Sequence, residues 1–283
     1  MNQRNADRRL EGKVAIVTGG GSGIGKAGSV LFGRHGARVL VADLNSSGAE
    51  GVAASIRETG GEALAYAVDV RDSQQVQAMV EAAEKEWGGV DLLFTNAVNA
   101  RLVNTQDRCA IDLDESVFDE IHQVVMRGVF LCAKYAGQAM VRRGDGAMIF
   151  TATVDAQVGC AGLDAYTAAK GGVVAFTRSL AAGLARHGIR VNAICPSFVN
   201  TEPQAEFMNH AATRQEIESL HLLPVPEPED VVPLALFLAS DDAKSITGSI
   251  HQVNAGFTAF KSQNVDVMEV MNRPEKESGP ADG

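Results

Sequence analysis

Residues 18–25 read TGGGSGIG, and they lie between the apolar run Val14–Val17 and a helix-like segment that extends to His35. Glycines at these positions allow a tight turn and let the backbone come close to a pyrophosphate. The following helix offers free N–H groups and the positive end of its dipole to the same anion. A glycine-rich turn alone is weak evidence, but its placement between a strand and a helix predicts a dinucleotide-binding loop.

Apolar runs alternate with amphipathic segments along the rest of the chain. The predicted strands are Val14–Val17, Arg38–Ala42, Ala63–Val68, Val90–Phe94, Ala147–Thr151, Ile189–Ile194 and Ile250–Val253. Helices are predicted around Ala49–Thr59, Ser73–Trp87, Ser116–Val141, Asp164–His187 and Pro228–Ala239. This alternation predicts βαβ units, and right-handed connections favour a doubly wound parallel sheet in a single α/β domain.

Two long segments and the C-terminal tail interrupt this alternation. Asn99–Glu115 reads as a polar connection, and 200–227 reads as a lid over the substrate. Long segments in compact domains tend to be binding loops or lids, and simple packing on the surface is the alternative. We expect the domain to cover 1–260 and the polar tail 261–283 to be flexible or to lie on a partner subunit.

The composition excludes several classes of protein. The chain has 283 residues, 46% of them hydrophobic, which is enough apolar material for a large core. The net charge of −10 argues against nucleic acid as a partner. The sequence has no apolar stretch of about 20 residues that could span a membrane, and its N-terminus does not resemble a secretory signal. Four scattered cysteines indicate reduced thiols in a cytoplasmic protein, with no metal site.

Asp43 ends the second predicted strand, on the order of 20 residues after the glycine loop. An acidic residue at this place accepts hydrogen bonds from the adenosine ribose hydroxyls and would repel a 2′-phosphate. NAD is therefore the expected cofactor, and NADP is less favoured. The competing interpretation is that Asp43 only caps the helix that follows it.

Tyr166 and Lys170 belong to the sequence YTAAK near the start of the predicted helix Asp164–His187. Their i,i+4 spacing puts both side chains on one face of the helix. A phenol with a pKa near 10 is a poor acid or base at neutral pH, but an ammonium and an oxidised nicotinamide both favour the phenolate. Tyr166 could then exchange a proton with an alcohol or a carbonyl oxygen.

Taken together, these motifs resemble the short-chain dehydrogenase/reductase family, and the resemblance extends from about Leu10 to Phe260. TGGGSGIG resembles the family's TGxxxGxG, YTAAK its YxxxK, and TGSIHQVNAG its TGxxxxVDGG. Asp69-Val70 matches the site whose Asp reaches the adenine amino group. VNAICPSFVNT resembles the stretch that contacts the nicotinamide carboxamide. The resemblance implies a Rossmann fold.

The resemblance also implies roles for individual residues. Tyr166 is the expected acid/base, Lys170 is expected to bind the nicotinamide ribose and lower the pKa of the tyrosine, and Thr153 is expected to orient the substrate oxygen. The expected contacts of the cofactor, besides Tyr166 and Lys170, are Thr18, Gly19, Gly21, Ser22, Gly23, Ile24, Gly25, Asp43, Leu44, Asp69, Val70, Asn96, Ala97, Val98, Pro196, Val199 and Thr201.

Four positions depart from the family's pattern. Thr153 stands in place of a Ser, which keeps the hydroxyl but adds a methyl and stiffens χ1. Val98 and Ser197 stand in place of glycines. Val125 stands in place of the Asn that supports a water-linked proton relay. Family members hold this water partly through the backbone carbonyl, so a weakened relay is expected if the helix is kinked there.

The leading prediction is an NAD-dependent oxidoreductase that interconverts a secondary alcohol and a ketone by hydride transfer. The alternative is a catalytically weak scaffold or a partner subunit of a mixed oligomer, which the departures at Val98, Val125 and Thr153 motivate. A nucleotide-sensing regulator is a third idea, but no DNA-reading motif supports it. The resemblance implies a homotetramer built through the two long helices, with a homodimer as the alternative.

Overall fold

The computed structural model describes residues 8–259, which form one seven-stranded sheet in the order β3-β2-β1-β4-β5-β6-β7. The strands are β1 (Val14–Thr18), β2 (Arg38–Asp43), β3 (Glu62–Ala67), β4 (Leu92–Thr95), β5 (Gly146–Thr151), β6 (Ile189–Pro196) and β7 (Ile250–Val253). Every neighbouring pair is parallel. The predicted doubly wound α/β fold, a single Rossmann domain, is confirmed.

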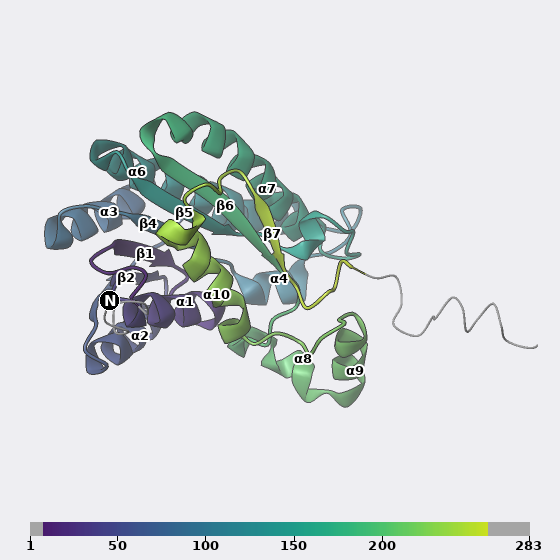
Figure 1. The fold of residues 1–283 in the computed structure, drawn as a ribbon. Coiled ribbons are helices and arrows are strands. Elements are labelled where there is room, and N and C mark those ends of the chain that lie inside the picture. The colour runs from purple at the N-terminus through teal and green to yellow at the C-terminus, as the bar shows by residue number, and fades with distance from the viewer. Residues whose placement is uncertain (1–7, 260–283) are drawn as a thin grey trace, which may run out of the picture.

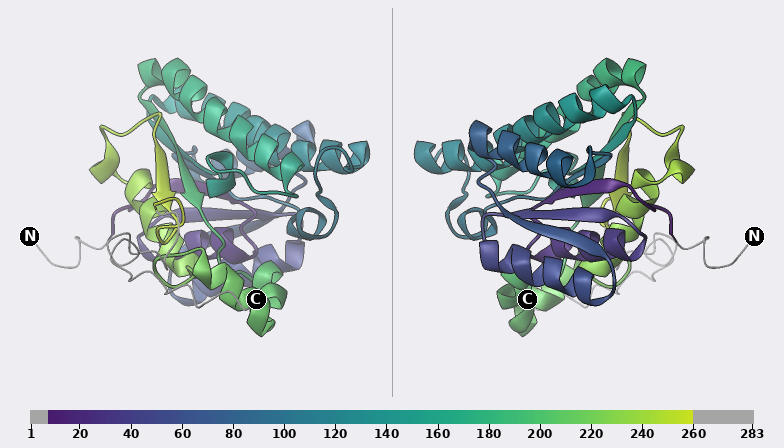
Figure 2. Two further views of the ribbon diagram at one scale, coloured as in Figure 1. Left: turned by 90° about the vertical axis from the view of Figure 1, so that its right-hand side faces the viewer. Right: turned by 90° about the vertical axis from the view of Figure 1, so that its left-hand side faces the viewer.

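Helices cover both faces of the sheet (Figures 1 and 2). One face carries α1 (Gly23–Arg34), α2 (Ser46–Glu58) and α10 (Pro228–Ala239). The other carries α3 (Ser73–Trp87), α6 (Gly128–Arg143) and α7 (Asp164–Leu184). Each layer has its own core, with Phe32 and Phe94 in the first and Met140 and Phe150 in the second. The central strands are therefore buried on both sides and read as continuous apolar runs.

Two helices match their predicted bounds to the residue, because their ends carry strong local signals. Asp72 caps α3 by accepting a hydrogen bond from the N–H of Gln74, and Gly88 ends it in the left-handed conformation with φ 83°. Glu227 and Asp230 form a capping box around the first turn of α10.

The two long helices differ from their predictions. Ser116–Val141 is not one α-helix but α5 (Glu115–His122), a π-helical turn over Gln123–Arg127, and α6. A π turn inserts one extra residue, which the spacing of apolar residues does not reveal. The α-helical part of Asp164–His187 ends at Leu184, and a 3-10 turn, Ala185–His187, finishes the segment before Gly188 at φ 74°.

The two long connections also contain short helices. Asn99–Glu115 holds α4 (Ala100–Gln106), which Asn99 caps by accepting a hydrogen bond from the N–H of Leu102. The predicted lid holds α8 (Ala205–Asn209) and α9 (Ala211–Ser219), which lie beside each other at the edge of the molecule (Figure 1). The role of this segment as a lid over the substrate stays a prediction, and the tail 261–283 lies outside the described residues. No helix within residues 8–259 is long and apolar enough to cross a membrane.

Candidate active site

A cavity of about 980 Å³ lies at the carboxyl ends of the strands, where open parallel sheets bind their ligands. Most of the residues expected from the sequence line it. They are Gly19, Ser22, Gly23, Ile24, Gly25, Asp43, Leu44, Asp69, Val70, Asn96, Ala97, Val98, Thr153, Tyr166, Lys170, Pro196, Val199 and Thr201. Two expected residues do not: Thr18 is buried at the end of β1, and Gly21 lies behind Asp43.

The glycine loop has no room for side chains. A Cβ on Gly25 would lie 2.1 Å from the carbonyl oxygen of Gly19. A Cβ on Gly19 would lie 2.7 Å from the backbone nitrogen of Ala97, and φ at Gly19 is +64°. The loop therefore presents bare backbone at the start of α1, which fits the binding of a pyrophosphate.

Asp43 is held in place by two backbone groups. The N–H of Gly21 donates to its Oδ2 at 2.9 Å, and the N–H of Asn45 donates to its Oδ1 at 2.9 Å. The residue that caps α2 is Asn45, whose side chain accepts from the N–H of Gly48, so the capping interpretation of Asp43 is wrong. Each carboxylate oxygen retains a further lone pair, and Asp43 lines the cavity, which suits ribose hydroxyls.

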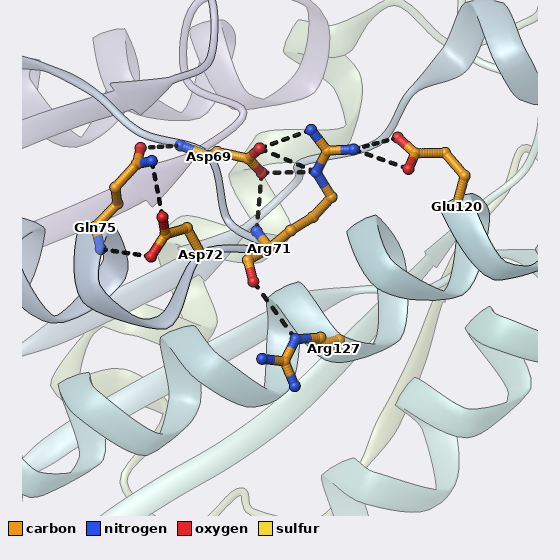
Figure 3. A network of polar contacts seen from close by, with 6 residues as sticks. All are labelled: Asp69, Arg71, Asp72, Gln75, Glu120 and Arg127. Carbon is orange, nitrogen blue, oxygen red and sulfur yellow. Dashed lines mark hydrogen bonds and ion pairs between the residues drawn. The ribbon is translucent and has the colours of Figure 1, made fainter.

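Asp69 belongs to an ion-pair network (Figure 3). The guanidinium of Arg71 donates to both oxygens of Asp69 and, on its other side, to both oxygens of Glu120. These hydrogen bonds hold the pKa of Asp69 below its usual value. Arg71 and Glu120 also line the cavity, and the sequence did not single them out. The contact of Asp69 with adenine stays a prediction.

A carboxylate from the start of the lid reaches the N-terminus of α1. The N–H of Gly23 donates to Glu202 at 3.0 Å, and Lys26 donates to the other carboxylate oxygen at 3.2 Å. An anion is thus bound at the helix terminus on which the sequence placed the pyrophosphate. Sequence reasoning missed Glu202 because it lies 179 residues away from Gly23.

Tyr166 lies in the first turn of α7, where a buried carboxylate fixes the backbone. Asp107, only 2% exposed, accepts hydrogen bonds from the N–H groups of Ala165 at 3.2 Å and Tyr166 at 2.9 Å. Asp107 follows α4, so the polar connection Asn99–Glu115 supplies the carboxylate that binds the N-terminus of α7.

Lys170 lies one turn after Tyr166, and its Nζ is 5.6 Å from the centre of the tyrosine ring. The ammonium donates to the backbone carbonyl of Thr151 at 2.5 Å. Burial lowers the pKa of Lys170 to about 8 and raises the pKa of Tyr166. Burial thus acts against the expected phenolate, and the lowering of the Tyr166 pKa by oxidised nicotinamide stays a prediction.

Thr153 has a charged partner that the sequence did not indicate. Its Oγ1 donates to Oδ2 of Asp155 at 2.9 Å, and the N–H of Asp155 donates back to Oγ1 at 3.3 Å. Both residues line the cavity beside Tyr166.

Two of the four departures acquire a structural explanation. Val125 is 1% exposed in the π-helical turn, so the helix is irregular there, while the side chain packs in the core and does not line the cavity. Ser197 is paired with the buried His221 of the lid. The Nδ1 of His221 donates to the carbonyl of Ile217, so its Nε2 accepts from the hydroxyl of Ser197 at 2.9 Å.

Comparison with known proteins identifies the family. Residues 19–258 match a family model described as enoyl-(acyl carrier protein) reductase. A probable short-chain type dehydrogenase/reductase of Bradyrhizobium diazoefficiens is 39% identical, over 89% of each chain. This chain belongs to the short-chain dehydrogenase/reductase family. Members of this family typically use NAD(P), and this short-chain dehydrogenase/reductase is an oxidoreductase.

Two further likenesses cover nearly the whole short-chain dehydrogenase/reductase domain. The 2,5-dichloro-2,5-cyclohexadiene-1,4-diol dehydrogenase of Sphingobium indicum is 37% identical, over 89% of this chain and 99% of the relative. The crystal structure of gox2181 superposes with a TM-score of 0.85 at 30% identity and covers 90% of this chain and 100% of that one.

Proposed function

We propose that this short-chain dehydrogenase/reductase is an NAD-dependent enzyme that interconverts a secondary alcohol and a ketone. The observation that carries the proposal is the presence of Thr153, Tyr166 and Lys170 in one cavity with the glycine loop and Asp43. Bound NAD supplies the acceptor or donor of the hydride.

The protein's own residues handle the oxygen and the proton. Tyr166 takes a proton from the alcohol or returns one to the ketone. Lys170 binds the ribose and favours the phenolate through its charge. Thr153 offers its hydroxyl to the reacting oxygen. The lining near these residues is otherwise largely apolar, with Leu163, Phe207 and Ile217, which suits a substrate with a carbon ring or chain.

The preference for NAD over NADP rests on charge. Asp43 is a fixed carboxylate at the end of β2, and the next residue, Leu44, is an exposed leucine and not a cation. Arg71 lies in the same cavity, but two carboxylates already engage its guanidinium. A 2′-phosphate would therefore meet repulsion from Asp43, and among residues 8–259 no free arginine lines the cavity to bind it.

Titration with NADH and NADPH, followed by protein fluorescence, tests the cofactor first. We expect NADH to bind more tightly than NADPH. Asp43→Ala should weaken the binding of NADH but not that of NADPH. Asp112→Ala, which removes an exposed charge from a loop, is the matched control. Binding of neither cofactor would favour the scaffold or partner-subunit interpretation, and the search would turn to a co-purifying dehydrogenase chain.

Oxidation of a panel of secondary alcohols tests the reaction. Tyr166→Phe removes the proton-transferring oxygen and should lower kcat by about 10²–10⁴-fold while NADH still binds. Unchanged turnover in this variant would exclude Tyr166 as the acid/base.

We further propose a cytoplasmic homotetramer, with a homodimer as the alternative. On the outer side of α6, Phe130 is 42% exposed and lies 6.3 Å from the ring of Phe176 on α7. Apolar side chains at such a place support burial against a second copy. Light scattering on Phe130→Glu, compared with the parent protein, tests this assembly: a smaller species supports it, and an unchanged mass excludes this contact.

A further inference from the structure

We infer that Asp155 selects vicinal diols, by accepting a hydrogen bond from the hydroxyl on the carbon next to the reacting carbinol. The inference rests on the proposed alcohol–ketone reaction and names its substrate class.

Asp155 is part of the substrate end of the cavity. It lies in the 3-10 turn Val154–Ala156, directly after β5 and Thr153, and it is half-buried. Its side chain lines the same cavity as Thr153 and Tyr166. The other charged residues of the lining, Asp43, Asp69, Arg71 and Glu120, belong to the cofactor end, with Lys170 beneath Tyr166.

The half-buried carboxylate of Asp155 has few partners for its charge. Within residues 8–259 its one side-chain donor is the hydroxyl of Thr153, and no basic side chain lies within ion-pair distance. The titratable groups that face it are Tyr166 and Cys160, which carry no positive charge. Burial accordingly raises the pKa of Asp155. A partly buried carboxylate with unused lone pairs can accept from a ligand that brings a donor.

The contact with Asp155 also determines what Thr153 can do. A threonine hydroxyl has one proton, and here that proton points to Asp155. A second substrate hydroxyl that donates to Asp155 replaces this bond and frees the Thr153 hydroxyl to donate to the reacting oxygen. A mono-alcohol brings no such donor, so Thr153 stays turned away from it.

The distance between the two side chains sets the spacing of the substrate hydroxyls. Oγ1 of Thr153 and Oδ2 of Asp155 are 2.9 Å apart, one hydrogen-bond length. A donor (Thr153) and an acceptor (Asp155) this close match two hydroxyls on adjacent carbons. The apolar lining, with Leu163, Phe207 and Ile217, offers no further charge to recognise a larger polar substrate.

The first test compares kcat/KM for cyclohexanol, 1,2-cyclohexanediol and 2-aminocyclohexanol. We expect the diol to exceed cyclohexanol by on the order of 100-fold, below the ratios of fully enclosed polar sites because Asp155 is only half-buried. Asp155→Ala should bring the ratio close to one and raise turnover of cyclohexanol, because Thr153 is freed. Asp155→Asn, which keeps the packing, should lose most of the preference. Asp112→Asn, an exposed loop charge, should change nothing.

Several outcomes would overturn the inference. Equal turnover of diol and cyclohexanol by the parent protein would do so, as would a clear preference for the amino alcohol, which would indicate recognition of a cation. If Asp155→Ala lowers the turnover of both alcohols alike, with an unchanged ratio, Asp155 only supports the turn.

Binding separates a failure of this inference from a failure of the proposed function. The fluorescence of the NADH complex reports binding of each alcohol without turnover. If no alcohol is oxidised, the proposed function fails, and diol binding that is at least tenfold tighter than cyclohexanol binding and depends on Asp155 still supports the inference. Equal or absent binding of the two alcohols overturns it.

Discussion

The glycine loop and the two hydroxyl positions Thr153 and Ser197 are held in place in different ways. At the glycine loop, backbone N–H groups of Gly21 and Gly23 donate to the carboxylates of Asp43 and Glu202. At the hydroxyl positions, side chains bind side chains: Thr153 binds Asp155, and Ser197 binds His221. The first region therefore depends on the path of the main chain, while the second depends on which side chains meet.

This difference separates two kinds of constraint. A main-chain site fails when a Cβ is added, because the backbone atoms around it have nowhere to move. At a side-chain site, the backbone keeps its conformation when one partner is replaced, but the donors and acceptors that the site offers to a ligand change. Substrate range in this fold can thus vary while the dinucleotide site stays the same.

The largest effect is expected from a methyl group in the glycine loop. Gly25→Ala forces a Cβ to within 2.1 Å of a backbone oxygen, and should lower the free energy of unfolding by about 3 kcal/mol. If that strain falls on the loop, NADH affinity drops roughly 100-fold. Urea denaturation and NADH titration measure both effects.

Gly51→Ala is the matched control for this change. A Cβ on Gly51, in the exposed middle of α2, meets nothing within 4 Å. This variant should gain about 0.5–1 kcal/mol from helix propensity. Equal stability and equal NADH affinity of the two variants would show that the loop does not need a bare backbone.

Removal of the carboxylate that holds α7 should have the next largest effect. Asp107→Ala leaves the N–H groups of Ala165 and Tyr166 without their partner, and should lower the free energy of unfolding by about 2 kcal/mol. Displacement of Tyr166 should also lower kcat about tenfold, a change of about 1.4 kcal/mol in the activation barrier.

Asp114→Ala provides the comparison, because Asp114 caps α5 in the same manner away from the cavity. We expect it to cost about 1 kcal/mol of stability with no change in kcat. A similar kcat for both cap variants would mean that Asp107 does not position Tyr166.

The buried ammonium of Lys170 should make the stability of the ligand-free enzyme depend on pH. Its pKa is lowered from 10.5 to about 8, so between these values the unfolded chain binds a proton that the folded chain does not. Stability should therefore rise with pH, by about 2 kcal/mol between pH 8 and pH 9.5. Urea denaturation of the parent and of Lys170→Met, repeated across this pH range, measures the change. The same dependence of the free energy of unfolding on pH in both proteins would contradict the prediction.

The smallest effect concerns the attachment of the lid. Ala255 has φ +48°, the one positive φ of a non-glycine residue within residues 8–259, and its carbonyl accepts from the N–H groups of Leu222 and Leu223. Ala255→Gly removes the strain of a side chain in this conformation and should raise the free energy of unfolding by about 0.5–1 kcal/mol. A thermal-melting comparison suffices, and a lowered Tm would show that Ala255 is not strained.

The sequence predicted the sheet well, and most of the expected site residues line one cavity, because their signals are short-range. The glycine loop, Asp43 and the Tyr166–Lys170 pair each appear within a few residues of a strand or helix end. Asp107 and Glu202 could not be found in this way, since they act on segments 59 and 179 residues away. The same holds for Ser197, which stands in place of a glycine. Its hydrogen-bond partner, His221, lies 24 residues away in the sequence.

The contact of Glu202 with the first turn of α1 makes ligand exchange a competition. Any phosphate that takes the N–H of Gly23 has to displace a carboxylate that is already bound there and already paired with Lys26. Glu202 is at the start of the segment that continues into α8 and α9. If the cofactor binds as proposed, its phosphate at this helix would break the contact between Glu202 and Gly23, and with it one attachment of that segment to α1.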